Sequence, residues 1–266
     1  MTAWTPFPEL DHLLHLLVSG IRSAMGEGLV GVYLQGSFAL GDADVHSDVD
    51  FIAVTECVVT AGQLDALQTM HGRLHRVPNR WASHLEGSYL PRGDVRRRGP
   101  EPRSFPYLDN GSHTLISDPH CDTQIVRWVV RERGVILAGP APATLIDPVG
   151  PDQLRGEMDG VLAELLRYAG QPSSVGRMSC WMQTFLVTTL CRILDTAATG
   201  TVVSKRAALE WARDRLPNEW RDLVQRAIDD RPDPWRRVRQ AADDRLVDRT
   251  LAFADWVVAQ GPQIDA

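Results

Sequence analysis

Two aspartates, Asp48 and Asp50, flank the first residue of an apolar run, VDFIAVT. In an extended strand, side chains at i and i+2 project to the same side with Cα atoms about 6.6 Å apart, so both carboxylates can reach one metal ion. Hard oxygen ligands of this kind suit Mg²⁺, which accepts one or two protein carboxylates and takes its other ligands from water and phosphates. The spacing therefore predicts that Asp48 and Asp50 are the Mg²⁺ ligands of a nucleotide site.

Gly36 and Ser37 follow another apolar run, and ten residues separate Ser37 from Asp48. Residues 38–43 could begin a short helix whose amide groups point at an anion. Because glycine lets the backbone approach and serine offers a hydroxyl, we expect Gly36 and Ser37 to bind the phosphates of a nucleotide. Attack on its α-phosphorus would then be stabilised by charge neutralisation. The alternative is an ordinary Gly-Ser turn beside an edge strand with solvated carboxylates.

The elements around this motif alternate between helix and strand through the first hundred residues. Apolar residues at spacings of three and four predict helices, and short β-branched runs predict strands. The expected helices are 8–25 and 61–77, and the expected strands are 29–35, 49–55 and 81–90. Such alternation favours an α/β sheet over a helical bundle.

From about residue 151 the pattern is helical throughout. A stripe begins at Leu154, a mostly apolar helix is expected at 178–197 with Gly200 closing it, and a last long helix at 234–259. Ser204 is the expected N-cap of the helix that follows it. The segment between 139 and 152 is rich in Pro and Gly and is the expected domain boundary.

Composition restricts the partners of the protein. The chain of 266 residues has 34 acidic and 28 basic residues, so it lacks the positive field of a non-specific nucleic-acid binder, and a small or cationic partner fits better. Its four cysteines show neither a C-x-x-C pair nor finger-like histidine spacing, so no disulfide framework or structural zinc is expected. Without a signal-like amino terminus or an apolar run of 18 residues, we expect a cytoplasmic protein that binds no membrane. We also expect a monomer, and the acidic balance predicts that it binds no nucleic acid.

The motif across residues 30–54 resembles that of the polymerase-β-type nucleotidyltransferase superfamily. Other segments resemble the aminoglycoside (3'')(9)-adenylyltransferase family, the streptomycin and spectinomycin modifying enzymes. These segments are HLEGSYLP (84–91), VRERGVILAGPAP (130–142), TLCRILDTAATGTVVSK (189–205) and EWARDRLP (210–217). The resemblance covers nearly the whole chain. It implies an α+β protein with a mixed-sheet nucleotidyltransferase domain at 1–150 and a helical bundle at 151–266 that helps to clamp substrate and nucleotide.

The resemblance also implies roles for three further residues. Glu86 stands where the family has its catalytic base, and a carboxylate near Mg²⁺ stays ionised and can accept a proton; alternatively, it is an edge-strand glutamate with a salt-bridge partner. Asp122 matches a family aspartate at the nucleotide and substrate cleft, or it is a helix N-cap. Lys205 stands where the family has a lysine that reaches the nucleotide phosphates from the second domain, or it is a solvated lysine.

Two departures concern the acceptor. The resemblance implies an indole in the loop before Asp122 and an acid on the first long helix of the second domain as streptomycin contacts. The loop here, 107–115, has no Trp, and the helix segment 177–186 has no acid, although Trp181 could pack in a similar role or belong to the core. Streptomycin is therefore not the predicted substrate.

Other candidate motifs have weaker support. His71 and His75 lie four residues apart on an expected helix, but without a third ligand they are expected on a solvated face. The basic run at 92–99 is expected to be an exposed turn, although it could bind phosphate or nucleic acid. No P-loop motif occurs, so the sequence does not predict a P-loop kinase.

The sequence thus predicts an enzyme that uses ATP and Mg²⁺ to adenylylate a hydroxyl of a cationic aminoglycoside or aminocyclitol, with release of pyrophosphate. One alternative is an adenylyltransferase that acts on a protein or another small metabolite. Another is a non-catalytic, antitoxin-like nucleotide-binding module, against which the set of Asp48, Asp50 and Glu86 argues because such a module needs no base.

Overall fold

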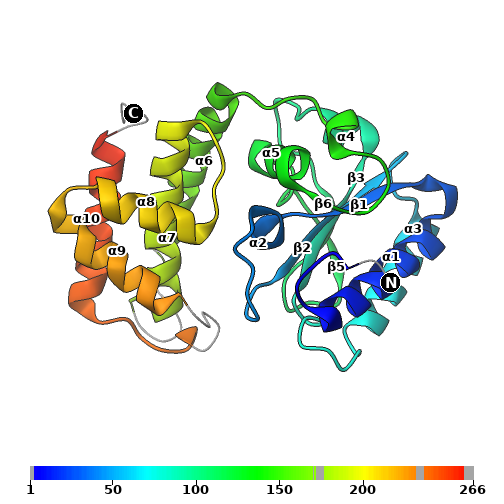
Figure 1. The fold of residues 1–266 in the computed structure, drawn as a ribbon, viewed down its shortest axis with the longest axis horizontal. Coiled ribbons are helices and arrows are strands. Elements are labelled where there is room, and N and C mark those ends of the chain that lie inside the picture. Colours follow the sequence, from blue (N-terminus) through cyan, green and yellow to red (C-terminus); the bar gives the residue numbers. More distant parts are fainter. Residues whose placement is uncertain (1–2, 170, 172–176, 232–236, 261–266) are drawn as a thin grey trace. The chain divides into compact units, whose positions relative to one another are not determined.

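A six-stranded mixed sheet forms the centre of the N-terminal half of the chain, with the strand order β5-β4-β3-β2-β1-β6 (Figure 1). Strands β2 and β3 are parallel, and every other neighbouring pair is antiparallel. The strands are β1 (Leu29–Leu34), β2 (Val49–Thr55), β3 (Leu85–Pro91), β4 (Phe105–Leu108), β5 (Leu115–Asp118) and β6 (Val135–Ala138). The central strands are apolar on both faces, as expected for strands covered on both sides.

The computed structural model describes residues 3–169, 171, 177–231 and 237–260. It divides into two units, Met1–Val149 (unit 1) and Gly150–Ala266 (unit 2), which are described separately. Among the described residues, no helix is both long enough and apolar enough to cross a membrane.

Two hydrophobic clusters cover the two faces of the unit 1 sheet. One joins helices α1 (Pro8–Met25) and α3 (Ala61–Leu74) to the face that carries Phe51, and the other joins α4 (Arg92–Arg96) and α5 (Gln124–Arg133) to the face that carries Ile52. Neighbouring residues of β2 therefore point to opposite faces, as the strand period of two requires. The remaining short elements are α2 (Gly36–Leu40), η1 (Gly26–Gly28) and η2 (Pro142–Thr144).

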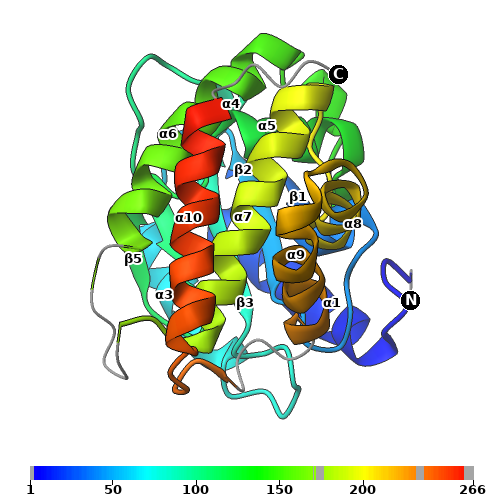
Figure 2. The same cartoon turned by 90° about the vertical axis from the view of Figure 1, so that its left-hand side faces the viewer.

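Unit 2 consists of helices. In Figure 2, α7 lies between α10 and the pair formed by α8 and α9. The helices are α6 (Pro151–Ala169), α7 (Cys180–Thr199), α8 (Lys205–Arg215), α9 (Asn218–Asp230) and α10 (Asp244–Gln260). Helix α7 ends at Gly200, which has a left-handed conformation with φ 68°, and α8 begins after Ser204, whose hydroxyl accepts a bond from the Ala207 amide. Both of these predicted helix boundaries are confirmed, as are the mixed sheet and the helical bundle.

Several predicted boundaries differ from the structure. The third strand begins at Leu85 rather than at 81, because residues 80–83 form a turn, and α3 ends at Leu74 rather than at 77. The last helix begins at Asp244, because the Asp243 side chain accepts bonds from the first helical amides; residues 234–236 of the prediction lie outside the described residues. Strands β4, β5 and β6 and helix α9 were not expected. The basic run at 92–99 is not a simple turn, because α4 occupies its first five residues.

Candidate active site

Three carboxylates converge where β2 and β3 begin. Asp48 immediately precedes β2, and Asp50 lies in register with Glu86 of the parallel strand β3. Residues in register on neighbouring strands point to the same side of a sheet, so these side chains meet. One oxygen from each of Asp48, Asp50 and Glu86 lies within 4.8 Å of the others, and all three residues are half-buried.

This cluster has the chemistry of a cation site. At such a separation two carboxylates repel each other by roughly 3 kcal/mol at an effective dielectric constant of about 20, so a bound cation would relieve an unfavourable arrangement. Carboxylate oxygens suit Mg²⁺, which leaves other coordination positions to phosphates and water. Among the described residues, this is the only group of three or more His, Cys, Asp or Glu side chains arranged to hold an ion.

Gly36 and Ser37 begin helix α2 beside the same carboxylates. The Gln35 amide donates to the Asp50 carbonyl over 2.9 Å, which ties the start of α2 to β2. Gly36 has φ 57°, and a Cβ at this position would collide with the Asp50 carboxylate, so the site requires glycine for two reasons. The Ser37 Oγ is buried without a hydrogen-bond partner among the described residues. A ligand atom would satisfy this hydroxyl, because buried polar groups are normally paired.

Glu86 is held by two donors. The Tyr107 hydroxyl donates to Glu86 Oε1 over 2.8 Å, and His120 Nε2 lies 3.1 Å from the same oxygen. The hydrogen bond to Glu86 raises the pKa of His120 above its usual value, and burial together with Glu86 raises the pKa of Tyr107, which therefore stays protonated. The predicted alternative for Glu86 was right about an ionic partner and wrong about the strand, because β3 is an interior strand.

Asp48 has an amide neighbour that the sequence did not indicate. The Asn110 Nδ2 donates to Asp48 Oδ2 over 3.4 Å, and His84 Nδ1 lies 3.0 Å from Asn110 Oδ1. The missed neighbours Tyr107, Asn110 and His120 come from β4, from the segment after it and from the turn before α5. A possible signal was the polar cluster of residues 109–113, but nothing in the local sequence relates it to Asp48.

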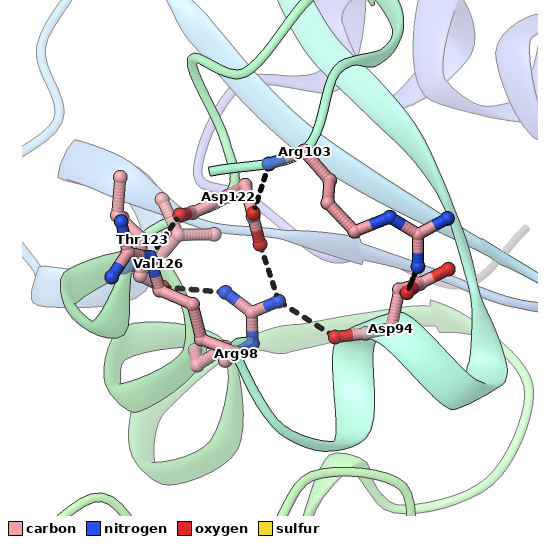
Figure 3. A network of polar contacts seen from close by, with 7 residues as sticks. Asp94, Arg98, Arg103, Asp122, Thr123 and Val126 are labelled. Atoms are coloured by element: carbon pink, nitrogen blue, oxygen red, sulfur yellow. Dashed lines mark hydrogen bonds and ion pairs between the residues drawn. The ribbon is translucent and has the colours of Figure 1, made fainter. Parts of the chain in front are cut away.

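The contacts of Asp122 make it a buried structural anchor. It is 3% exposed; Arg127 Nη2 donates to Oδ1 over 2.6 Å, and the Arg103 amide donates to Oδ2 over 2.7 Å (Figure 3). The Arg98 Nε also donates to the Asp122 carbonyl. The N-cap of α5 is Thr123 rather than Asp122, so that alternative is wrong by one residue. The predicted contact of Asp122 with a nucleotide stays a prediction.

In unit 2, Lys205 is the exposed first residue of α8. Its predicted role at the phosphates stays a prediction. Trp181 is half-buried and stacks on Phe185 with ring centroids 5.2 Å apart.

His71 is not on a solvated face, which corrects the prediction for this residue. It is 1% exposed, its Nε2 lies 2.6 Å from the Tyr89 hydroxyl, and it stacks on Phe51. Helix α3 packs this side against the sheet, and burial lowers the pKa of His71 to about 4. His75, one turn later, is half-buried.

Comparisons with known proteins find similar adenylyltransferases. Residues 157–260 match the family model described as aminoglycoside adenylyltransferase, C-terminal domain. A spectinomycin 9-adenylyltransferase of Staphylococcus aureus is 28% identical over 214 residues, covering 75% of this chain and 76% of that protein. An aminoglycoside (3'') (9) adenylyltransferase of Escherichia coli is 27% identical over 270 residues, covering 94% of this chain and 92% of that protein.

A solved structure shares the fold. It is a spectinomycin adenyltransferase from Enterococcus faecialis with ATP and spectinomycin; the TM-score is 0.69 at 15% identity, covering 93% of this chain and 99% of the other. Together with the sequence matches, this fold defines an enzyme of the nucleotidyltransferase class. The chain is thus similar over most of its length to aminoglycoside adenylyltransferases, and its residues 157–260 match the model of their C-terminal domain.

Proposed function

We propose that this protein is a Mg²⁺-dependent adenylyltransferase that moves AMP from ATP to a hydroxyl of an aminoglycoside or aminocyclitol and releases pyrophosphate. The convergence of Asp48, Asp50 and Glu86 within 4.8 Å is the observation that carries the proposal. A pair of carboxylates beside a third that is aimed at the same point supplies both metal ligands and a base.

Each residue of the site would have a distinct role in the reaction. Asp48 and Asp50 would hold Mg²⁺, which when bound neutralises charge on the phosphates. Ser37 Oγ would donate to a phosphate oxygen, and Gly36 would let that phosphate approach the backbone. Glu86 would take the proton of the acceptor hydroxyl while the hydroxyl oxygen attacks the α-phosphorus. The bond from that phosphorus to the bridging oxygen then breaks, and pyrophosphate leaves.

Spectinomycin is the acceptor to test first. One relative is named as a spectinomycin 9-adenylyltransferase, and the chain lacks both expected streptomycin contacts, the indole in 107–115 and the acid in 177–186. The acidic side chains of the cluster would also attract a cationic acceptor, because charges in a partly desolvated site interact more strongly than charges in water.

A pyrophosphate-release assay tests this function. The enzyme is given ATP and Mg²⁺ with a panel containing spectinomycin, streptomycin and other aminoglycosides, and parallel reactions contain a chelator. We expect release with spectinomycin only when Mg²⁺ is present, and a product whose mass has increased by one AMP. Release with protein acceptors alone would replace this function with protein adenylylation, and the absence of release with every acceptor would support the binding module.

A further inference from the structure

Two side chains bind the same oxygen of Glu86. Tyr107 and His120 both bind its Oε1 atom, and their rings stack with centroids 4.9 Å apart at an interplanar angle of 23°. The Tyr107 hydroxyl has one proton to give, and Glu86 Oε1 at 2.8 Å is nearer than Asp109 Oδ1 at 3.2 Å. The three side chains therefore form one connected group, which we call the Glu86 clamp.

The two donors of the clamp come from separate elements. Tyr107 lies on β4, the direct neighbour of β3, and is 4% exposed, so its position follows from the sheet. His120 lies in the turn between β5 and α5, and its own side chain is 58% exposed. Because the His120 side chain is exposed, its single bond to Glu86 requires that other contacts hold the backbone at His120.

Hydrogen bonds and a buried ion pair hold the backbone of the turn that carries His120. The Asp122 amide donates to the Pro119 carbonyl over 2.7 Å, and the His120 amide donates to Asp118 Oδ1 over 2.8 Å. The Asp122 carboxylate is held by the buried Arg127 guanidinium, and Cys121, which lies between His120 and Asp122 in the chain, is buried. The pair of Asp122 and Arg127 thus anchors the chain two residues after His120.

We propose that His120 and Tyr107 are positioning residues that aim the Glu86 carboxylate at the acceptor hydroxyl. A glutamate side chain rotates about three bonds, and a displacement of about 1 Å in a reacting group can cost roughly 10²-fold in rate. Two donors on Oε1 restrict that rotation before any substrate binds. The inference rests on the proposed function in that Glu86 is the base.

A double-mutant cycle tests the clamp in the full-length enzyme. His120→Ala is expected to lower kcat about 10- to 100-fold, as loss of an orienting partner typically does, with the KM for ATP nearly unchanged. Tyr107→Phe, which removes only the hydroxyl, should lower kcat in the same direction. His120→Gln should recover much of the loss, because its amide nitrogen can reach the position of Nε2. His12→Ala, a change at an exposed histidine of α1, is the matched control and should keep full kcat.

The cycle with Glu86→Gln separates positioning from a general structural effect. If His120 acts through the base, His120→Ala should lower kcat less than about 2-fold in the Glu86→Gln background. An equal loss in both backgrounds, or a kcat within about 2-fold of the wild type for His120→Ala alone, would overturn the inference. A Glu86→Gln variant with full kcat would instead overturn the base assignment of the proposed function.

A crystal structure of His120→Ala gives a readout that needs no acceptor. We expect the Glu86 carboxylate to occupy more than one conformation in that variant. A single conformer in its original place would contradict the clamp, whatever the transfer assay shows.

Discussion

Unit 1 contains two groups of acidic side chains in opposite environments. Asp48, Asp50 and Glu86 are half-buried and converge within 4.8 Å of one another, which is unfavourable for like charges. Asp122 is almost fully buried and lies 2.6 Å from the Arg127 guanidinium. All four side chains are carboxylates, but the first three are arranged for a ligand and Asp122 is satisfied by the protein. Substitutions in the two groups should therefore affect different observables.

The largest expected effect is in the converging group. Asp50→Asn should abolish turnover, because a neutral amide is a poor Mg²⁺ ligand. It should leave the thermal midpoint unchanged or slightly raised, because it relieves repulsion between like charges. Asp65→Asn, at an exposed carboxylate on α3, is the control and should keep full activity. Near-full activity of Asp50→Asn at saturating Mg²⁺ would argue decisively against the metal assignment.

Within the same group, Glu86→Gln preserves shape and removes the base. It should lower kcat by about 10²- to 10⁴-fold with little change in ATP affinity. Steady-state kinetics together with ATP titration measures both quantities. An unchanged kcat, in an assay limited by the chemical step, would place the base elsewhere.

The buried group should respond through stability. Asp122→Asn leaves the Arg127 guanidinium buried without its counter-charge and should lower the free energy of unfolding by about 3–5 kcal/mol. Urea unfolding measures this change. Asp147→Asn is the matched control, because Asp147 pairs with the exposed Arg96 and Arg97. This variant should lose much less free energy of unfolding. Equal losses in the two variants would remove the distinction between buried and exposed carboxylates.

A buried histidine extends the comparison to the other face of β2. His71 has a folded-state pKa of about 4, below its ordinary 6.5, so between these values the unfolded chain binds a proton that the folded protein does not. Stability from this group is therefore full above pH 6.5 and falls by up to about 3 kcal/mol as the pH drops to 4. Urea unfolding measures the free energy of unfolding across this pH range. For the double variant His71→Leu with Tyr89→Phe, this free energy should depend less on pH than it does for the wild type. Identical slopes for the variant and the wild type would exclude His71 as the cause.

The smallest expected effect concerns a buried hydroxyl that has no protein partner. Ser37→Ala should not lower stability, because the Oγ atom bonds to no described residue, but it should weaken ATP binding about 5-fold by removing roughly 1 kcal/mol of hydrogen bonding. Unfolding and ATP titration on one preparation test both parts. A loss of stability with normal ATP affinity would mean that the hydroxyl serves the fold.

The sequence predicted those parts whose information is local. The strand Val49–Thr55, the helix Pro8–Met25 and the caps at Ser204 and Gly200 follow from neighbouring residues, and the structure has them at the predicted positions. The convergence of Asp48 and Asp50 follows from strand geometry. The meeting of Asp50 with Glu86 needed the parallel pairing of two strands, which the sequence alone did not specify.

The partners of the site were missed for physical reasons. Strand β4 has four residues, one of which is Pro106, so its local signal is weak. Tyr107 and His120 reach Glu86 only through the pairing of β3, β4 and β5. Helix α9 was detectable, because its buried residues recur at helical spacing: Trp220, Leu223, Val224 and Ala227.

The fate of the ATP phosphates tests the central claim most directly. The wild type and Asp50→Asn are each incubated with spectinomycin, Mg²⁺ and ATP labelled either at the α-phosphorus or at the γ-phosphorus. We predict that the α-label enters spectinomycin with the wild type only, and that the γ-label is recovered in pyrophosphate. Transfer of the γ-label to spectinomycin, or transfer of the α-label at the wild-type rate by Asp50→Asn, would contradict AMP transfer at the cluster of Asp48, Asp50 and Glu86.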